Sequence, residues 1–240
     1  ITDDETGGDC TSIGTWNSAS KTCILGSNIT ETVVVQSDGI TFNGNGKSIS
    51  VLYHNFSVPN EESGIYIDGF NDILITNVNV NMAGAGVFVI NSENTIIKDS
   101  MFSDIEWTTI IIEHSTGIQI SNNVLENNNV GIGTNDMHNN IIKQNEIKNT
   151  LQSAIMLCGH SSSNSVFENV INDANLALNL CSNAANNEFF QNTISNIERS
   201  IVHGDGTFQT HLPSNENKIY NNNLHGTLII ESIPKEHSSL

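Results

Sequence analysis

Basic residues are scarce in this 240-residue sequence. Lys and Arg together number 8 against 26 Asp and Glu, which gives a formal net charge of −18. Because nucleic-acid phosphates are bound by basic surfaces, this balance argues against a nucleic-acid partner. It also disfavours anionic membranes and the unaided binding of polyanionic sugars. Neutral glycans, cations and basic protein partners remain open.

Long apolar runs are also lacking, so we expect no membrane span. The sequence begins at Ile1 rather than Met, which predicts a processed or trimmed form. Asn28 and Asn55 each begin an Asn-X-Ser/Thr sequon and are candidate glycosylation sites. These features favour a secreted, cell-surface or periplasmic-like location.

The strongest feature that is present is an internal repeat of about 23 residues. One apolar series recurs at spacings of 22, 23, 22, 23, 23, 23 and 27, at Ile65, Val87, Ile110, Ile132, Ile155, Leu178, Ile201 and Leu228. A second series recurs at spacings of 22, 23, 24, 23 and 30, at Phe102, Val124, Ile147, Ile171, Ile194 and Leu224. Both series lengthen where residues 204–214 supply a loop insertion, so they describe one repeat.

The repeat predicts stacked strands. Each unit is too short for a helix–turn–helix pair and carries apolar residues in alternation. A coil of this length buries those residues inside, and the next coil stacks on it at roughly 4.8 Å by parallel pairing. We predict an all-β fold, a single-stranded right-handed parallel β-helix of about eight coils of 22–24 residues. Residues 1–30 are expected to form an N-terminal cap, residues 31–230 the β-helix, and residues 231–240 a C-terminal tail or closing strand.

Asparagine is abundant, with 37 copies, and its place in the repeat explains why. Two places before the second apolar series stand Ser100, Asn122, Asn145, Asn169, Asn192 and Asn222. Asn tolerates left-handed backbone and bonds its own turn. Stacked coils would align these amides into a ladder, so the Asn content is expected to be structural.

Two stretches resemble known β-helix proteins. Residues 37–49 resemble the first-coil motif of pectate-lyase-like β-helix proteins, and the coil at residues 140–147 is similar to the NosD-type group. That group lies in a branch of carbohydrate-binding proteins and sugar hydrolases. The resemblance implies carbohydrate processing, carbohydrate binding, or a role near copper-enzyme maturation. The matching residues are turn and core positions, so the resemblance does not choose among these functions.

The four cysteines are expected to form two disulfides. Cys10 and Cys23 bracket a short polar segment of the cap. Cys158 and Cys181 each stand three places after a member of the first apolar series. Stacking therefore places their Cα atoms about 4.8 Å apart, within the disulfide window. A stacked pair of free thiols is the alternative.

One turn region carries candidate metal ligands. His114, Asp136, His138 and His160 come from three consecutive coils, and His and Asp bind Zn or Cu. These residues predict a Cu or Zn site, although their spacing is not a compact motif such as His-X-X-X-His. The alternative is four solvated turn residues.

Candidate catalytic residues are fewer. Glu113 and Asp136 lie in adjacent coils and could meet the carboxyl separation that inverting glycosidases need, but stacked acids also arise by chance in so acidic a chain. β-Elimination on a polyuronate needs a cation beside the carboxylate, and Arg199 is the only Arg in the sequence.

An apolar stripe is expected on the outside of the coils, at Tyr66, Phe88 and Ile111. Such a stripe marks an interaction surface if it is exposed; otherwise the loop at residues 52–63 covers it. The sequence favours an extracellular, non-enzymatic binding or structural module with a protein partner or self-association. The alternatives are a carbohydrate-active enzyme (hydrolase, lyase or epimerase) and a metal-binding or copper-enzyme accessory protein.

Overall fold

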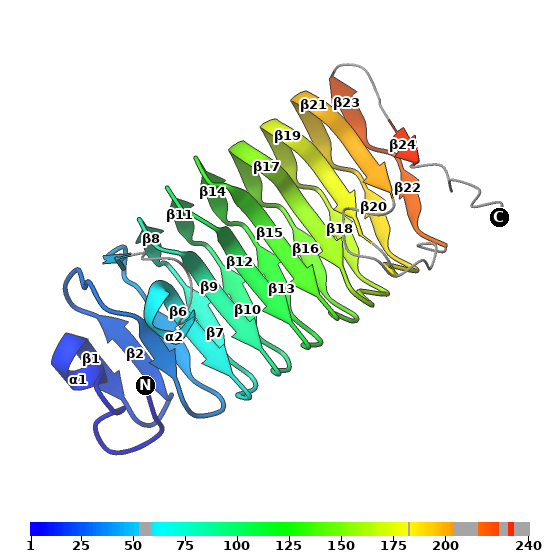
Figure 1. Cartoon of the computed structure of the whole chain (residues 1–240). Coiled ribbons are helices and arrows are strands. Elements are labelled where there is room, and N and C mark those ends of the chain that lie inside the picture. The colour runs from blue at the N-terminus through cyan, green and yellow to red at the C-terminus, as the bar shows by residue number, and fades with distance from the viewer. Residues whose placement is uncertain (53–58, 182, 204–215, 226–229, 233–240) are drawn as a thin grey trace, which may run out of the picture.

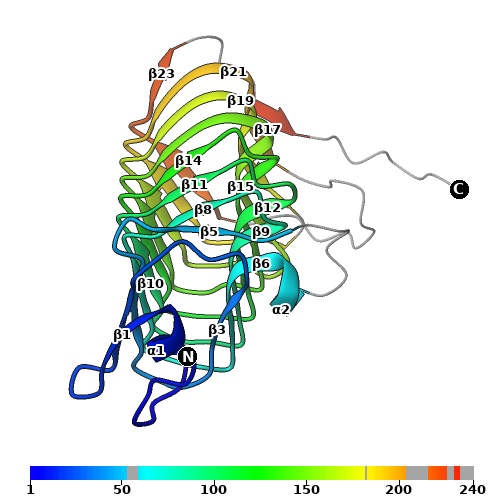
Figure 2. The same ribbon diagram turned by 90° about the vertical axis from the view of Figure 1, so that its left-hand side faces the viewer.

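The strands of the protein stack as rungs along one axis (Figure 1). The computed structural model describes residues 1–52, 59–181, 183–203, 216–225 and 230–232. Turned by 90°, the coils nest behind one another around a common interior (Figure 2). The chain is a right-handed parallel β-solenoid of about seven regular turns, close to the eight predicted. Within the part of the chain described, no helix is long and apolar enough to cross a membrane.

One side of the solenoid is a ten-stranded sheet. Its strands, in spatial order, are β1 (Gly14–Asn17), β2 (Thr22–Leu25), β4 (Thr41–Asn43), β7 (Leu74–Thr76), β10 (Ile96–Lys98), β13 (Gln119–Ser121), β16 (Ile141–Lys143), β18 (Ser165–Phe167), β20 (Glu188–Phe190) and β22 (Lys218–Tyr220). Among the described strands of this sheet only β1 and β2 pair antiparallel, and every later pair is parallel. Parallel stacking thus begins at β2, inside the segment that the sequence assigned to the cap.

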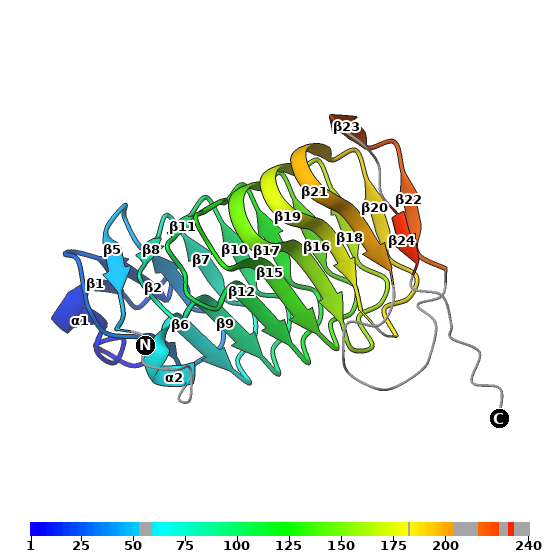
Figure 3. The same cartoon turned by 45° about the horizontal axis from the view of Figure 1, so that its top comes forward.

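The other two sides join into one larger sheet. One side holds β3 (Val33–Val35), β6 (Ser63–Asp68), β9 (Ala85–Ile90), β12 (Thr108–Glu113), β15 (Val130–Asn135) and β24 (Ile230–Ser232). The other holds β5 (Ser48–Ser50), β8 (Asn79–Asn81), β11 (Met101–Ser103), β14 (Val124–Glu126) and β23 (Asn223–His225). Three long strands bend across both sides: β17 (Glu146–Cys158), β19 (Val170–Leu180) and β21 (Thr193–His203). Figure 3 shows these long strands running beside β12 and β15.

The core follows the predicted repeat, with two corrections. The first apolar series pairs coil to coil as expected from Ile65 to Ile201, and its members up to Leu178 are fully buried. In the second series Leu125, not Val124, occupies the buried position beside Phe102, because Val124 pairs with Met101. At the C-terminal end Ile230 pairs with Ile201. The repeat predicts Leu228 at this place, and Leu228 lies outside the described residues.

Asparagine ladders connect the coils, as predicted. In one ladder each backbone N–H donates to the Oδ1 of the Asn one coil further, at 2.9–3.1 Å, along Ser100, Asn123, Asn145, Asn169, Asn192 and Asn222. Asn123 takes the place predicted for Asn122, which instead has a φ of 55° at the exposed corner. A second ladder, which the sequence did not reveal, runs through Asn140, Asn164, Asn187 and Asn217.

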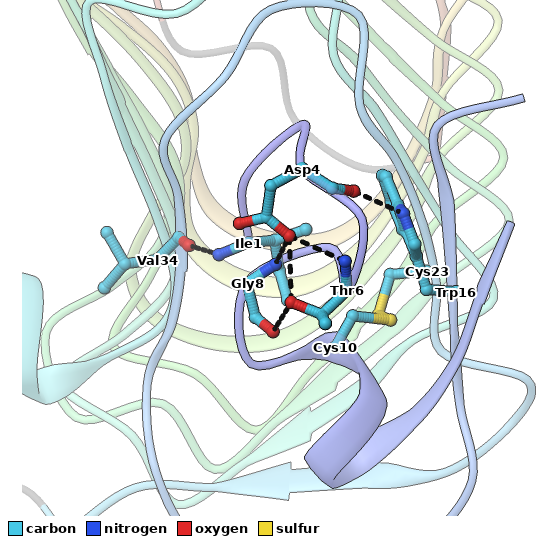
Figure 4. Close-up of a disulfide and its surroundings, with 8 residues drawn as sticks. All are labelled: Ile1, Asp4, Thr6, Gly8, Cys10, Trp16, Cys23 and Val34. Atoms are coloured by element: carbon cyan, nitrogen blue, oxygen red, sulfur yellow. Dashed lines mark hydrogen bonds between the residues drawn. A yellow bond between two sulfur atoms is a disulfide. The ribbon is translucent and has the colours of Figure 1, made fainter. Parts of the chain in front are cut away.

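The N-terminal cap is a compact hydrogen-bonded turn (Figure 4). The Cys10–Cys23 disulfide joins α1 (Cys10–Ile13) to β2. The Asp4 carboxylate accepts hydrogen bonds from the Thr2 hydroxyl and from the backbone N–H groups of residues 6 and 8, which hold the pKa of Asp4 well below its usual range. The cap therefore covers the open end of the core with satisfied polar groups.

Candidate functional site on the outer face

Two of the three residues of the predicted apolar stripe are buried. Phe88 and Ile111 lie on the outer side of β9 and β12, yet they are only 6% and 4% exposed and form a small second core with Ala85. Tyr66 packs against this cluster, with its ring edge-on to Phe88 at a centroid distance of 5.6 Å. The helix α2 (Pro59–Glu62) contacts β6 and β9 from outside (Figure 2). Phe88 and Ile111 are therefore buried, as the alternative of a covered stripe expects, whereas Tyr66 is partly exposed; residues 53–58 of that loop lie outside the described part.

Beside this cluster, a tyrosine lies between two acids. Tyr66 and Asp68 are two places apart on β6, so their side chains emerge on the same side of the sheet, and the Tyr66 hydroxyl lies 3.4 Å from Asp68 Oδ2. Burial raises the pKa of Tyr66, and the carboxylates of Asp68 and Glu113 raise it further. Asn91 donates its amide to the other Asp68 oxygen at 3.0 Å.

The spacing of the two acids follows from the strand register. Asp68 pairs with Ile90, and Ile90 pairs with Glu113, so the two acids stand two coils apart in one column. Adjacent strands lie about 4.8 Å apart, which sets the Cα atoms of Asp68 and Glu113 on the order of 10 Å from each other. The sequence carried this signal, because both acids stand three places after a member of the first apolar series. The pair that the sequence analysis predicts is instead Glu113 with Asp136, in adjacent coils.

The carboxylate of Asp136 contacts two histidines, His114 and His160. It accepts the backbone N–H of His160 at 2.7 Å and lies 3.1 Å from His160 Nδ1 and 3.3 Å from His114 Nδ1. The backbone N–H of His160 lowers the pKa of Asp136, and the two imidazoles lower it further. A carboxyl group with a lowered pKa is a poor general acid, and Asp136 lies beside His114 at the corner rather than in the column of Glu113. A catalytic role for the Glu113–Asp136 pair stays a prediction, and Asp68 is a further acid that stands in the column of Glu113.

One extra residue between Cys158 and Ser162 brings Asp136 and His160 together. Cys158 pairs with Asn135 and Ser162 bridges to His138, so three residues of the later coil stand opposite two of the earlier one. Gly159, with a φ of +62°, takes the corner opposite Asp136. A Cβ there would come within 2.7 Å of Asp136 Oδ1, so glycine lets the next residue, His160, reach the carboxylate.

Three of the four predicted metal ligands thus come together, and the fourth does not. His138 Nδ1 lies 2.8 Å from the Ser162 hydroxyl, away from Asp136. Among the described residues, no group of three or more His, Cys, Asp or Glu is placed to hold a metal in common. The site of Cu or Zn remains a prediction.

The remaining predicted sites are the second disulfide and the two glycosylation sequons. Cys158 and Cys181 form a disulfide with a Cα–Cα distance of 4.6 Å, as the stacking predicted, at the end of the column that contains Glu113 and Asn135. Asn28 is exposed, and its Oδ1 accepts the N–H of Ser48 at 3.0 Å. Asn55 lies outside the described residues, and glycosylation at both positions stays a prediction.

Comparison with solved structures finds similar solenoids. An alginate lyase from Paenibacillus sp. superposes with a TM-score of 0.60 and 10% identity, covering 96% of this chain and 95% of that one. A lacto-N-biosidase from Eubacterium ramulus gives a TM-score of 0.45 at 8% identity, covering 86% of this chain and 45% of that chain. At such identities the likeness concerns the fold alone. A search of curated protein sequences finds no match.

The match to a family model covers most of the chain. The model described as "Right handed beta helix region" matches residues 63–224, from the start of β6 into β23. These are the coils whose core series and ladders are described above. The chain therefore belongs to the right-handed β-helix family.

Proposed function

We propose that this chain is an extracellular carbohydrate-active protein that hydrolyses a neutral glycan on the outer face of β6, β9 and β12. The observation that carries the proposal is the column of Asp68 and Glu113, with the Tyr66 hydroxyl in the field of both carboxylates. Inverting glycosidases use two carboxyl groups some 6.5–9.5 Å apart, one as general acid and the other as base for water. Side chains on Cα atoms two coils apart can span that separation.

The charge of this face selects the substrate class. The strands β6, β9, β12 and β15 contain no Lys or Arg, and the chain carries a formal charge of −18. A polyuronate would meet repulsion there, with no cation on these strands to neutralise its carboxylates. The similar alginate lyase supports carbohydrate chemistry on this fold, whereas the acidic face favours a neutral glycan for this chain.

Two aromatic residues are exposed on this side of the solenoid. Tyr66 is partly exposed beside Asp68, and Trp107, which immediately precedes β12 at the opposite end of that strand from Glu113, is 43% exposed. Tyr and Trp combine an apolar ring with a polar O–H or N–H group, so they suit ligands that present both apolar and polar surface. Two disulfides support the extracellular setting, since they persist in oxidising compartments.

Hydrolysis of neutral polysaccharides tests the proposal. We expect the protein to release reducing ends from at least one glucan, mannan or galactan, with the new anomeric centre inverted by NMR. Glu113→Gln and Asp68→Asn should each lower kcat about 100-fold or more, since each removes an acid–base group. Asp104→Asn, at an exposed corner between β11 and β12, is the matched control and should retain activity.

Three outcomes would count against hydrolysis at this pair. Binding without release of reducing ends would favour the non-enzymatic binding module. An unsaturated product would identify a lyase. Hydrolysis that survives both substitutions would place the catalytic groups elsewhere on the solenoid.

A further inference from the structure

A polar hollow lies at the first regular corner of the solenoid, away from the face of β6 and β9. It has a volume of about 360 Å³ and is lined by Asn43, Asn45, Gly46, Asn77, Asn79 and Asp99. These residues belong to the corners where β4, β7 and β10 of the ten-stranded sheet turn into β5, β8 and β11. The outer face proposed for hydrolysis is on the third side, so the two sites are separate.

The hollow exists because the first corner is wider than those that follow. Four residues connect β4 to β5, whereas two connect β7 to β8 and two connect β10 to β11. The wide turn is the Asn-Gly-Asn-Gly motif at residues 43–46. Asn43 Oδ1 accepts the N–H of Asn45 at 2.8 Å, and Gly46 N–H donates to the Asn77 carbonyl at 2.9 Å. These bonds fix the turn against the next coil.

Glycine is required where the turn meets its neighbour. A Cβ on Gly44 would stand 2.5 Å from the Asn77 carbonyl oxygen and 2.6 Å from the Val78 Cα. Both contacts are with backbone, so they cannot be relieved by moving a side chain. The motif therefore builds a close backbone approach on one side and leaves the asparagine side chains around the open hollow.

Hydrogen-bonding groups in the hollow are left unused within the described residues. The Asn77 side chain makes no hydrogen bond there. Asn79 donates its amide to the Gly46 carbonyl at 3.1 Å, which leaves its Oδ1 without a donor. Asn43 uses its Oδ1 in the turn, which leaves its NH₂ group without an acceptor. Donors and acceptors that are not used within the described part of the chain thus line the hollow.

The balance of these groups selects the ligand. Asp99 is the only charged residue in the lining, and Lys98 Nζ lies 3.5 Å from its carboxylate. Tight Ca²⁺ sites collect six to eight oxygens with several carboxylates, whereas this lining mixes NH₂ donors with oxygen acceptors. Sugar hydroxyls are both donors and acceptors and complement such a lining. We propose that this hollow binds one neutral sugar unit, at a site distinct from the hydrolytic face.

Titration with neutral methyl glycosides tests this site. The probes are the methyl glycosides of glucose, galactose, mannose and N-acetylglucosamine. Their binding to the full chain is measured by saturation-transfer NMR. We expect at least one to bind the wild type, and Asn77→Gly to weaken its affinity about tenfold or more, because the site loses amide hydrogen bonds. Asn77 has a φ of 51°, so glycine removes the amide without backbone strain.

Asn122→Gly is the matched control. Asn122 has a φ of 55° at the equivalent corner two coils further, outside the hollow, and its replacement should leave affinity unchanged. The same titration in Asp68→Asn/Glu113→Gln should also retain binding, which separates this site from the proposed hydrolytic one. Absence of binding by all four glycosides, or equal affinity in Asn77→Gly and wild type, would overturn the proposal. A Ca²⁺-induced rise in Tm that Asp99→Asn abolishes, without glycoside binding, would overturn it in favour of a cation site.

Discussion

Buried and exposed asparagines play different parts in this molecule. Asn169 is fully buried, and its amide donates to the carbonyls of Ile142 and Phe167 and to Asn192 Oδ1, at 2.9–3.1 Å. Asn122 is exposed and makes no side-chain hydrogen bond within the described residues, but it holds a left-handed corner. The same residue type is therefore used once for its amide and once for its backbone conformation. Asn45 and Asn77 also hold left-handed corners, but they line the hollow together with Asn43 and Asn79, which is why they are candidates for binding.

The largest effect should come from breaking a buried ladder. Asn169→Ala removes three donor contacts and the Oδ1 that accepts both the N–H and the amide of Asn145. Buried groups left without partners cost about 1–3 kcal/mol each. We expect the free energy of unfolding to fall by about 3 kcal/mol or more in urea denaturation.

An exposed amide serves as the control for the ladder. Asn122→Gly also deletes an amide, but from a solvated corner, and we expect a change below about 0.5 kcal/mol. Similar losses for Asn169→Ala and Asn122→Gly would contradict a special role for the buried ladder.

A smaller change in the free energy of unfolding should test whether the corners depend on residues that tolerate left-handed backbone. Asn122→Val places a β-branched residue at a φ of 55°, where L-residues are strained by roughly 1–2 kcal/mol. We expect Asn122→Val to lower the free energy of unfolding by about that amount relative to Asn122→Gly. Equal stability of the two variants would show that the corner does not depend on the left-handed preference of Asn.

The repeat determined most of the fold because its spacing is nearly constant. Stacking requires equivalent residues to recur once per coil, so the core from Ile65 to Leu178 and the Cys158–Cys181 bridge followed from spacing alone. The spacing did not predict which of two neighbouring residues turns inward. Leu125 and Asn123 therefore take the buried places predicted for Val124 and Asn122.

The candidate site was harder to predict because it depends on corners and on neighbouring coils. The extra residue at Gly159 brings His160 to Asp136, a contact that regular spacing of the coils does not predict. Periodicity identified the outward stripe, but it did not predict that Phe88 and Ile111 are buried, because burial depends on tertiary contacts such as that of α2 with β9. The Asp68–Glu113 column could be predicted from the repeat, but only by comparing equivalent residues in coils that are two apart.

The smallest expected effect concerns a corner that carries charge. Asp136 has a φ of 52°, like the asparagine corners, but its pKa is lowered by the His160 backbone N–H and by the imidazoles of His160 and His114. A group whose folded pKa is depressed stabilises the fold above its unfolded pKa of about 3.9 and loses that contribution as pH falls through the lower folded value. Asp136→Asn should therefore cost stability at pH 5, by less than about 1 kcal/mol for so exposed a cluster, and the cost should shrink towards pH 2.

Asp104→Asn separates this effect from the general charge of the protein. Asp104 has a φ of 56° and makes no side-chain hydrogen bond or ion pair within the described residues. Urea unfolding at several pH values from 2 to 8 should show a pH-dependent difference from wild type that is larger for Asp136→Asn than for Asp104→Asn. The two variants share the loss of one negative charge from a chain of formal charge −18, so parallel curves would mean that relief of overall repulsion accounts for both. In that case Asp136 would act at its corner as the asparagines do, through backbone conformation rather than through its contacts with His114 and His160.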